Sequence, residues 1–211
     1  AMHAALDDPL RVGVSVESAL QVEAIEEEGE STAPSELAQK LAKGHFIISV
    51  EMSPPKGIAT EKAARAAHML REAGADVINV SDSPMARMRM SPWAVCHLLQ
   101  HDVGLETVLH FPTRGRNLLR VQGDLLATHA LGVRNLFVVM GDPTHIGDYP
   151  DAADNFDIVP SGLVRLIKNN LNQGHDWGGN KIGQPTNFLV GCALNLSQTE
   201  IEREIKVLRK K

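Results

Sequence analysis

The sequence predicts an α/β protein in which helices cover a parallel β-sheet. From His45 onward, short apolar runs rich in β-branched and aromatic residues alternate with helical stretches. The first four runs start roughly 30 residues apart, the length of a strand–helix–strand unit. The runs are almost continuously apolar, as is typical of strands that are buried on both faces. A (β/α)8 barrel and an open doubly wound sheet both fit this alternation.

Five apolar runs are the candidate strands, and they occupy residues 46–50, 77–80, 107–109, 136–140 and 188–190. Helical patterns lie between them, and Gly74 and Gly132 fall where two of these helices are expected to end. A barrel needs eight strand–helix units and typically ~250 residues. If the fold is a barrel, the 211 residues hold only about its first five βα units, and we expect such a fragment to be inactive alone.

Composition and charge disfavour several classes of function. The net charge of −5 argues against nonspecific binding to nucleic acid or to anionic membranes, and no apolar run approaches the ~18 residues of a membrane span. Cys96 and Cys192 lie in apolar segments and are interpreted as buried free thiols, which predicts a cytoplasmic protein. His97 and His101 have the spacing of metal ligands but lack a third ligand nearby, so we expect no metal site.

The segment before the first strand has a different character. Residues 11–36 contain a cluster of glutamates around Gly29 followed by Ser, Thr and Pro, which indicates an acidic linker. Pro34, Ser35 and Glu36 then open a short helix that is expected to run to Lys43.

Polar residues follow each candidate strand, at the end where barrel enzymes carry out their chemistry. They are Glu51, Ser81, Asp82, Ser83, His110, Gly141, Asp142 and Asn195. Each has a structural explanation when taken alone, since Asp and Ser often cap the following helix. Because all of them stand at matching positions, they would converge on one face, and the sequence predicts a functional site there.

Glu51 is the strongest catalytic candidate of this group. It follows an apolar run directly, and Pro54 and Pro55 stiffen the chain after it. A carboxyl at the mouth of a barrel is expected to be partly desolvated, which suits it to general acid catalysis near neutral pH. The alternative is a salt bridge with a nearby Arg or Lys.

Two of these strand ends carry motifs of a known family. Residues 50–55 (Val-Glu-Met-Ser-Pro-Pro) and 139–143 (Val-Met-Gly-Asp-Pro) resemble the first-strand and fourth-strand motifs of methylenetetrahydrofolate reductases. Further segments are similar to the version found in bacterial proteins that fuse a homocysteine S-methyltransferase to this reductase; they are residues 116–119, 130–135, 147–151, 156–163 and 190–195.

The resemblance implies a division of the chain. Residues 1–8 resemble the last helix of the methyltransferase half, residues 9–43 would be an interdomain linker with a short helix, and residues 44–211 would be the N-terminal part of the reductase TIM barrel. Methionine biosynthesis would then be the context, with a fused homocysteine S-methyltransferase domain as partner. Homo-oligomerisation stays open.

The family binds FAD at the carboxyl end of its barrel. NAD(P)H reduces the flavin, and 5,10-methylenetetrahydrofolate then takes the hydride to become 5-methyltetrahydrofolate. Carried over by position, Glu51 would be the general acid that protonates N10 of the folate. Asp142 would lie near the flavin pyrimidine and the folate pterin. The choice between NADH and NADPH stays open.

The resemblance also assigns the flavin contacts. Residues expected to line the flavin are Ser81, Asp82, His110, Met140, Gly141 and Asp142, with Val159, Pro160 and Leu194 at its outer portion and Lys210 and Lys211 at its diphosphate. Met140 stands where some relatives have arginine, and Leu194 stands where many have an aromatic ring. Two alternatives remain: a flavin-free, pterin-binding methyltransferase barrel, and a non-catalytic scaffold. The colour of the purified protein separates them from a flavoenzyme.

Overall fold

The computed structural model describes residues 33–196 and 201–209. The chain divides into two units, residues 1–32 and residues 33–211, and the description below concerns the second. The expected methyltransferase tail, residues 1–8, and most of the expected linker, residues 9–43, lie outside the described residues.

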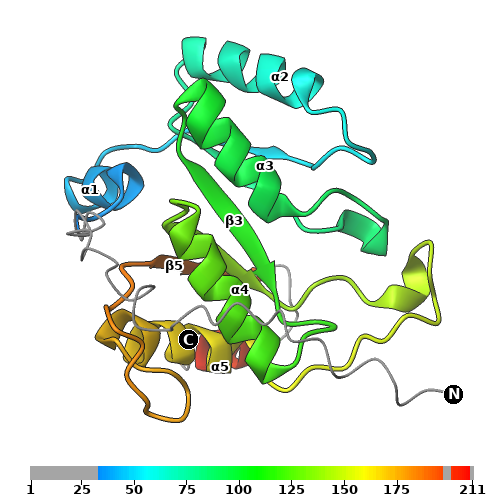
Figure 1. Cartoon of the computed structure of the whole chain (residues 1–211), viewed down its shortest axis with the longest axis vertical. Coiled ribbons are helices and arrows are strands. Elements are labelled where there is room, and N and C mark those ends of the chain that lie inside the picture. Colours follow the sequence, from blue (N-terminus) through cyan, green and yellow to red (C-terminus); the bar gives the residue numbers. More distant parts are fainter. Residues whose placement is uncertain (1–32, 197–200, 210–211) are drawn as a thin grey trace, which may run out of the picture. The chain divides into compact units, whose positions relative to one another are not determined.

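Five parallel strands form one sheet in the order β1-β2-β3-β4-β5 (Figure 1). They are β1 (Ser49–Met52), β2 (Val77–Val80), β3 (Thr107–Pro112), β4 (Asn135–Val139) and β5 (Leu189–Cys192). The α-helices are α1 (Glu36–Ala42), α2 (Glu61–Glu72), α3 (Pro92–Leu98), α4 (Leu118–Ala130), α5 (Pro160–Asn169) and α6 (Ile201–Leu208). A doubly wound sheet reverses its strand order at a switch point, whereas this order is sequential. The prediction of an α/β fold with the first five units of a (β/α)8 barrel is therefore confirmed.

Local chemistry explains where several helices begin and end. The Ser35 side chain caps α1 by accepting a hydrogen bond from the backbone N–H of Ala38 at 3.1 Å, and Asn117 caps α4 in the same way. Gly74 and Gly132 follow α2 and α4 with φ angles of +89° and +78°. Only glycine adopts this conformation without strain, so the predicted helix ends are confirmed.

The predicted bounds of the strands were less accurate than their number and order. β1 begins at Ser49 rather than at residue 46, and the Phe46 side chain is 90% exposed. The backbone N–H of Ile48 donates to the Asp76 carboxylate at 2.8 Å, so a side chain replaces the strand ladder at this point. β3 continues to Pro112, which places His110 inside a strand and not after one.

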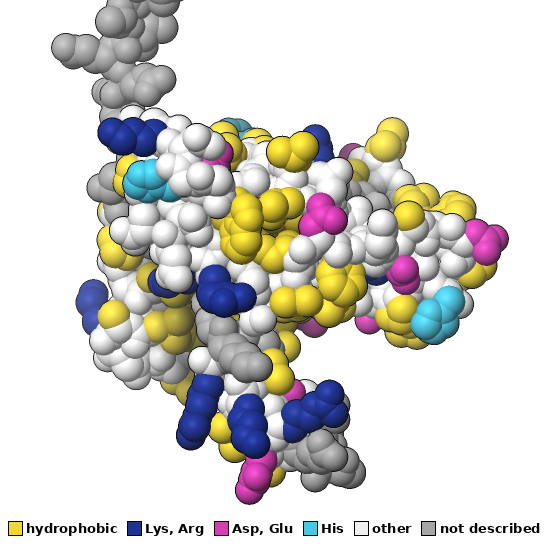
Figure 2. Space-filling model, turned by 90° about the horizontal axis from the view of Figure 1, so that it is seen from below, with side chains coloured by type: hydrophobic (Ala, Val, Ile, Leu, Met, Phe, Trp, Pro, Cys, Tyr) yellow, Lys and Arg dark blue, Asp and Glu magenta, His cyan; other side chains and the backbone are white. Residues whose placement is uncertain are grey.

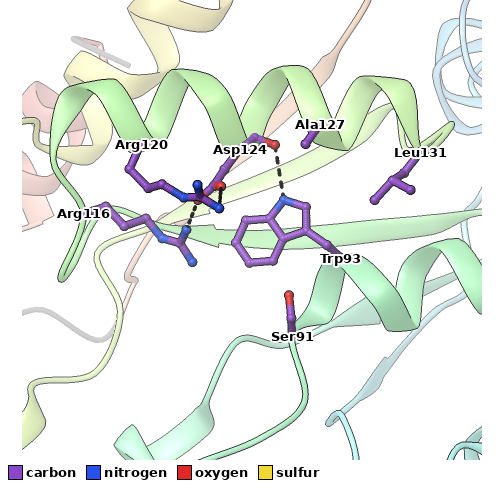
Figure 3. A pocket seen from close by; sticks show the side chains of 7 residues that line it. All are labelled: Ser91, Trp93, Arg116, Arg120, Asp124, Ala127 and Leu131. Atoms are coloured by element: carbon purple, nitrogen blue, oxygen red, sulfur yellow. Dashed lines mark hydrogen bonds and ion pairs between the residues drawn. The ribbon is translucent and has the colours of Figure 1, made fainter. Parts of the chain in front are cut away.

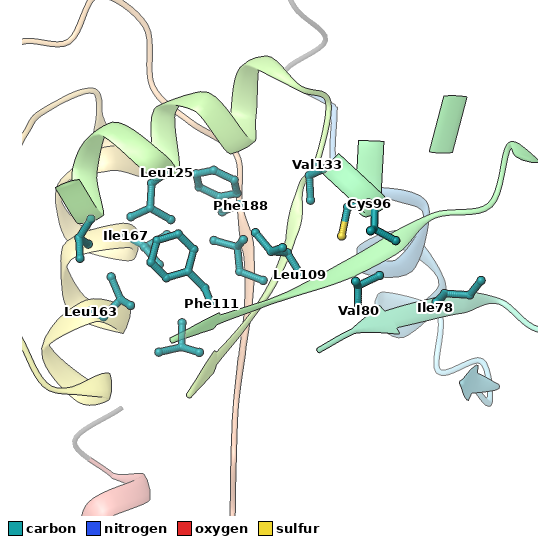
Figure 4. Packing of buried hydrophobic residues seen from close by; sticks show 14 of the residues in the cluster. Ile78, Val80, Cys96, Leu109, Phe111, Leu125, Val133, Leu163, Ile167 and Phe188 are labelled. Carbon is teal, nitrogen blue, oxygen red and sulfur yellow. The ribbon is translucent and has the colours of Figure 1, made fainter. Parts of the chain in front are cut away.

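The main core lies between one face of the sheet and the helices (Figure 4). Alternate strand residues such as Leu109 and Phe111 point to this face and are fully buried against Leu125 of α4 and Leu163 of α5. Cys96 is buried in the same cluster, and desolvation raises the pKa of its thiol to about 12. Cys192 is only half-buried, so the expectation of two buried thiols is correct for one of them.

Among the described residues, the buried apolar side chains on the opposite face of the sheet gather near the amino ends of the strands. There Leu37 of α1 packs against Val77 and Val108. The Glu106 carboxylate accepts hydrogen bonds from the backbone N–H groups of Glu36 and Leu37 at 2.7 and 2.8 Å, which anchors α1 through its amino end. The carboxyl ends of this face are therefore left free for the polar residues singled out in the sequence.

Apolar side chains also gather at the surface, as Figure 2 shows on the face that it presents. None of the helices in the described part of the chain is long and apolar enough to cross a membrane.

Candidate active site

Four of the predicted site residues come together around the carboxyl ends of β1, β2 and β3. Glu51 and His110 lie on the sheet face opposite the main core, because their strand neighbours Met52, Leu109 and Phe111 pack against the helices. Ser81 and Asp82 directly follow β2. Both Glu51 and Asp82 act electrostatically on His110, so the side chains predicted from three separate segments do converge.

The hydroxyl of Ser81 is buried and interacts with another strand end. Ser81 is 5% exposed, and its Oγ donates a hydrogen bond of 3.4 Å to Ser53 Oγ. The Asp82 carboxylate is also held on both oxygens, by Ser83 Oγ at 2.8 Å and by Arg116 Nη2 at 3.3 Å. These two residues are fixed by their neighbours before any ligand is considered.

His110 is half-buried, and its ring centroid lies 5.0 Å from that of Phe137. Desolvation lowers the pKa of His110 below the ordinary value of 6.5, and the negative charges of Glu51 and Asp82 oppose this shift without reversing it. The imidazole is therefore mostly neutral at pH 7, with one ring nitrogen as a donor and the other as an acceptor.

This burial predicts a pH dependence of stability. The folded state binds fewer protons at His110 than the unfolded state does, so its contribution to stability is complete above pH 6.5 and is lost as the pH falls through the folded pKa. His110→Gln is expected to make the free energy of unfolding less sensitive to pH between 7.5 and 5.5. Urea unfolding at both pH values measures the difference. His101→Gln is the control, because that side chain is 76% exposed. Equal pH sensitivity of the wild type and His110→Gln would contradict the expectation.

Glu51 lies within β1 and is exposed, so the partial desolvation expected from the sequence is absent from the described residues. The physical reason is that β1 pairs with only one described neighbour, β2, and nothing described covers its open face. None of the ion pairs formed by the described residues includes Glu51. The salt-bridge alternative is therefore wrong for this part of the chain, and the carboxylate is accessible.

Asp142 follows β4 and is held by two neighbouring loops. Its Oδ2 accepts a hydrogen bond from the backbone N–H of Met85 at 2.7 Å, and Arg114 donates to its backbone carbonyl. Met85 belongs to the 3₁₀ turn η2 (Pro84–Ala86), where Ser83, Met85 and Ala86 have φ angles of 43°, 60° and 51°. Backbone strain of this kind costs about 1–3 kcal/mol per residue and is concentrated at functional sites, so the turn has a cost that the Asp142 hydrogen bond helps to offset.

Gly141 and Met140 complete this strand end. Gly141 has a φ of +92°, and a Cβ built on it would lie 3.1 Å from Pro112 Cβ. Glycine is therefore required here both for its conformation and for space. Met140 is 42% exposed, and Thr113 Oγ1 contacts its sulfur at 3.4 Å.

The remaining predicted contacts lie in other places. Val159 and Pro160 form the amino end of α5, and Leu194 follows β5. Val159 and Leu194 are 45% and 42% exposed. Lys210 and Lys211 lie outside the described residues, so their expected contact with a diphosphate stays a prediction.

The sequence reasoning missed a buried cluster formed by Arg116, Trp93 and Asp124 (Figure 3). Arg116 also pairs with Asp82, and Arg120 pairs with the second oxygen of Asp124. Trp93, Arg116, Arg120 and Asp124 line a pocket of about 370 Å³ between α3 and α4. The available sequence signal was the four-residue spacing of Arg120 and Asp124, which places opposite charges on one side of α4; nothing in the sequence placed Arg116 beside them.

Among the described residues, no group of three or more His, Cys, Asp or Glu side chains is placed to hold a metal ion. His97 instead bonds the backbone oxygen of Leu131 through Nδ1 at 3.1 Å.

Comparison with known proteins assigns the chain to a family. No curated protein matches the sequence. The sequence model of the methylenetetrahydrofolate reductase family matches residues 36–209, which includes all five strands and the polar residues at their carboxyl ends. The chain therefore belongs to the methylenetetrahydrofolate reductase family, whose members are oxidoreductases that act on methylenetetrahydrofolate.

Proposed function

We propose that this chain supplies the first five βα units of an FAD-dependent reductase that converts 5,10-methylenetetrahydrofolate to 5-methyltetrahydrofolate with NAD(P)H. The observation that carries the proposal is the convergence of Glu51, Ser81, Asp82 and His110 at the carboxyl ends of the strands, on the face opposite the core. In barrel enzymes this end holds the active site.

The residues at this end fit a flavin. Its ring system is flat and aromatic with a polar edge, so it needs apolar surface together with a few fixed donors and acceptors. The His110 and Phe137 rings and the exposed Met140 side chain offer the apolar surface. Ser81 and the neutral His110 offer hydrogen-bonding groups.

The flavin, when bound, supplies hydride chemistry, and the chain's own residues bind, orient and move protons. Glu51 is proposed to give a proton to N10 of the folate once the completed barrel and the bound ligands desolvate its carboxyl. Among the described residues it has no ion-pair partner that would hold it ionised. Asp142 is proposed to stabilise positive charge on the folate. Val159, Pro160 and Leu194 are proposed to contact the outer flavin, and Lys210 and Lys211 its diphosphate.

The domain organisation is part of the same proposal. Both edge strands of the described sheet, β1 and β5, have one partner each, and three further βα units would join them into a closed barrel. Residues 1–8 are proposed to end a fused homocysteine S-methyltransferase domain, and residues 9–43 to link it to the barrel. Cys96 and Cys192 are free thiols. Because unpaired cysteines are typical of reducing compartments, they support the proposal of a cytoplasmic location.

The test uses the full-length protein. We expect flavin absorption bands in the purified protein, bleaching by NADH or NADPH without oxygen, and recovery of the bands on addition of methylenetetrahydrofolate. A colourless protein that FAD does not reconstitute would contradict the flavin proposal. A flavoprotein whose reduced form is not reoxidised by the folate would contradict the substrate.

Asp142→Asn is expected to slow the folate half-reaction about tenfold or more and to leave flavin reduction no slower. One charge at 4 Å contributes about 1–4 kcal/mol between water and a protein surface, and this charge favours a cationic folate while opposing an anionic reduced flavin. Asparagine keeps an oxygen that can accept the Met85 N–H, so the loop is expected to stay in place. Stopped-flow measurement of each half-reaction checks the result.

The matched control for this prediction is Asp148→Asn, which removes the same charge from the same loop. Asp148 lies 3.9 Å from Arg87 and both side chains are more than half exposed, so little change is expected. If Asp142→Asn and Asp148→Asn behave alike, Asp142 has no special role.

A further inference from the structure

We propose that Arg116 is a positioning residue, which holds Asp82 in place beside His110 by bridging it to Asp124 on α4. The proposal rests on the proposed function, because Asp82 and His110 are two of the residues assigned there to the flavin. Arg116 is not one of the residues assigned to the flavin. It acts on the proposed site through its ion pair with Asp82.

The bridge joins two neighbouring βα units. Arg116 lies in the connection between β3 and α4, Asp82 follows β2, and Asp124 is in the second turn of α4. The guanidinium donates through Nη2 to Asp82 at 3.3 Å and through Nη1 to Asp124. One planar fork therefore binds two carboxylates that are 42 residues apart in the sequence.

The bridge is buried, which makes each member costly to remove. The side chains of Arg116, Asp82 and Asp124 are 18%, 11% and 10% exposed. The Arg116 guanidinium also lies 4.5 Å from the centroid of the Trp93 ring (Figure 3) and 5.3 Å from that of the Phe111 ring. A carboxylate that loses its only cation in such surroundings must move toward water or become protonated. Loss of Arg116 is therefore expected to release Asp82.

Asp82 connects the bridge to the proposed site. Val80 pairs with Leu109 in the sheet, so Asp82, two residues after Val80, lies beside the strand end that carries His110. The negative charge of Asp82, like that of Glu51, opposes the lowering of the His110 pKa by desolvation. Arg116 thus sets the distance between a fixed negative charge and His110. Lysine cannot replace it, because an ammonium group is a single point charge without two coplanar donor edges.

The chain offers a matched control in Arg120. Its guanidinium pairs with the same Asp124 at 2.8 Å, but the side chain is 73% exposed, and none of the ion pairs of the described residues joins it to Asp82. Arg120→Gln removes the same charge from the same helix end and leaves the link to Asp82 intact.

The first experiment follows His110 in the full-length protein without added flavin. NMR of labelled histidine, assigned with His110→Gln, gives the pKa of His110 in the wild type, Asp82→Asn, Arg116→Gln and the double variant. Asp82→Asn is expected to lower this pKa in the wild-type and Arg120→Gln backgrounds, and to have little effect in the Arg116→Gln background. An equal effect of Asp82→Asn with and without Arg116 would overturn the proposal.

The second experiment measures FAD affinity by titration of the same proteins. Arg116→Gln is expected to weaken binding about tenfold, and Arg120→Gln by less than twofold. Equal weakening by both variants would overturn the link to the site. If the wild type binds no FAD, the proposed function fails, while the His110 measurement still decides whether Arg116 positions Asp82. If Arg116→Gln does not fold, Arg116→Lys takes its place, and it is expected to lose the same coupling.

Discussion

Glu51→Gln is expected to abolish folate reduction in the full-length protein, while FAD binding and flavin reduction by NAD(P)H continue. Hydride transfer to the flavin needs no proton at N10 of the folate, whereas opening of the folate ring does. General acids contribute about 10²–10⁴-fold to rates, so the loss should be of that size and confined to the folate half-reaction. Stopped-flow kinetics of the two half-reactions gives the answer.

FAD binding and flavin reduction serve as the folding controls for Glu51→Gln, because both need an assembled site. A loss confined to the folate half-reaction therefore cannot come from unfolding, and thermal unfolding of the variant and of the wild type checks this directly. Glu61→Gln, an exposed residue in the first turn of α2, makes the same chemical change away from the site. Near-normal folate turnover by Glu51→Gln would remove this residue from the mechanism.

Phe111→Ala is expected to lower the free energy of unfolding by about 3–5 kcal/mol, the usual cost of deleting a buried phenyl ring. Phe111 is completely buried at the centre of the main core (Figure 4). Its ring also meets Trp93 edge-to-face, with the centroids 5.4 Å apart. Urea unfolding of the full-length protein, followed through tryptophan fluorescence, measures the loss.

The control for this prediction is Leu119→Ala on α4, where the side chain is 83% exposed. We expect it to change stability by less than about 0.5 kcal/mol. A loss of similar size at both positions would mean that the core does not depend on Phe111.

The order and type of the elements could be predicted because they depend on local patterns. Each strand is an apolar run of its own, and the helices between them carry their own stop signals at Gly74 and Gly132. The strand ends depend on distant partners. The Asp76 carboxylate takes the Ile48 N–H, so the apolar residue Phe46 is left outside the sheet. Nothing near residue 46 in the sequence reveals this.

In the candidate site, too, local patterns could be predicted from the sequence and contacts between distant residues could not. Polar residues after apolar runs identified Glu51, Ser81, Asp82 and Asp142, because barrel geometry brings such positions to one end. The sequence did not reveal that the backbone of Met85 would hold Asp142, since that contact depends on the path of a strained turn. It also did not pair Arg116 with Asp82, because the two residues meet only after β2 and β3 have aligned.

The sequential strand order also suits the direction of protein synthesis. Each of the four later strands pairs with the strand made just before it, so a partner already exists when each new strand leaves the ribosome. Contacts between neighbours in sequence lower the entropy cost of pairing and favour rapid folding. The amino-terminal helix α1 is the exception. Ser35 bonds to Asn135, 100 residues later, at 2.6 Å, so this hydrogen bond of the helix can form only once β4 has been made.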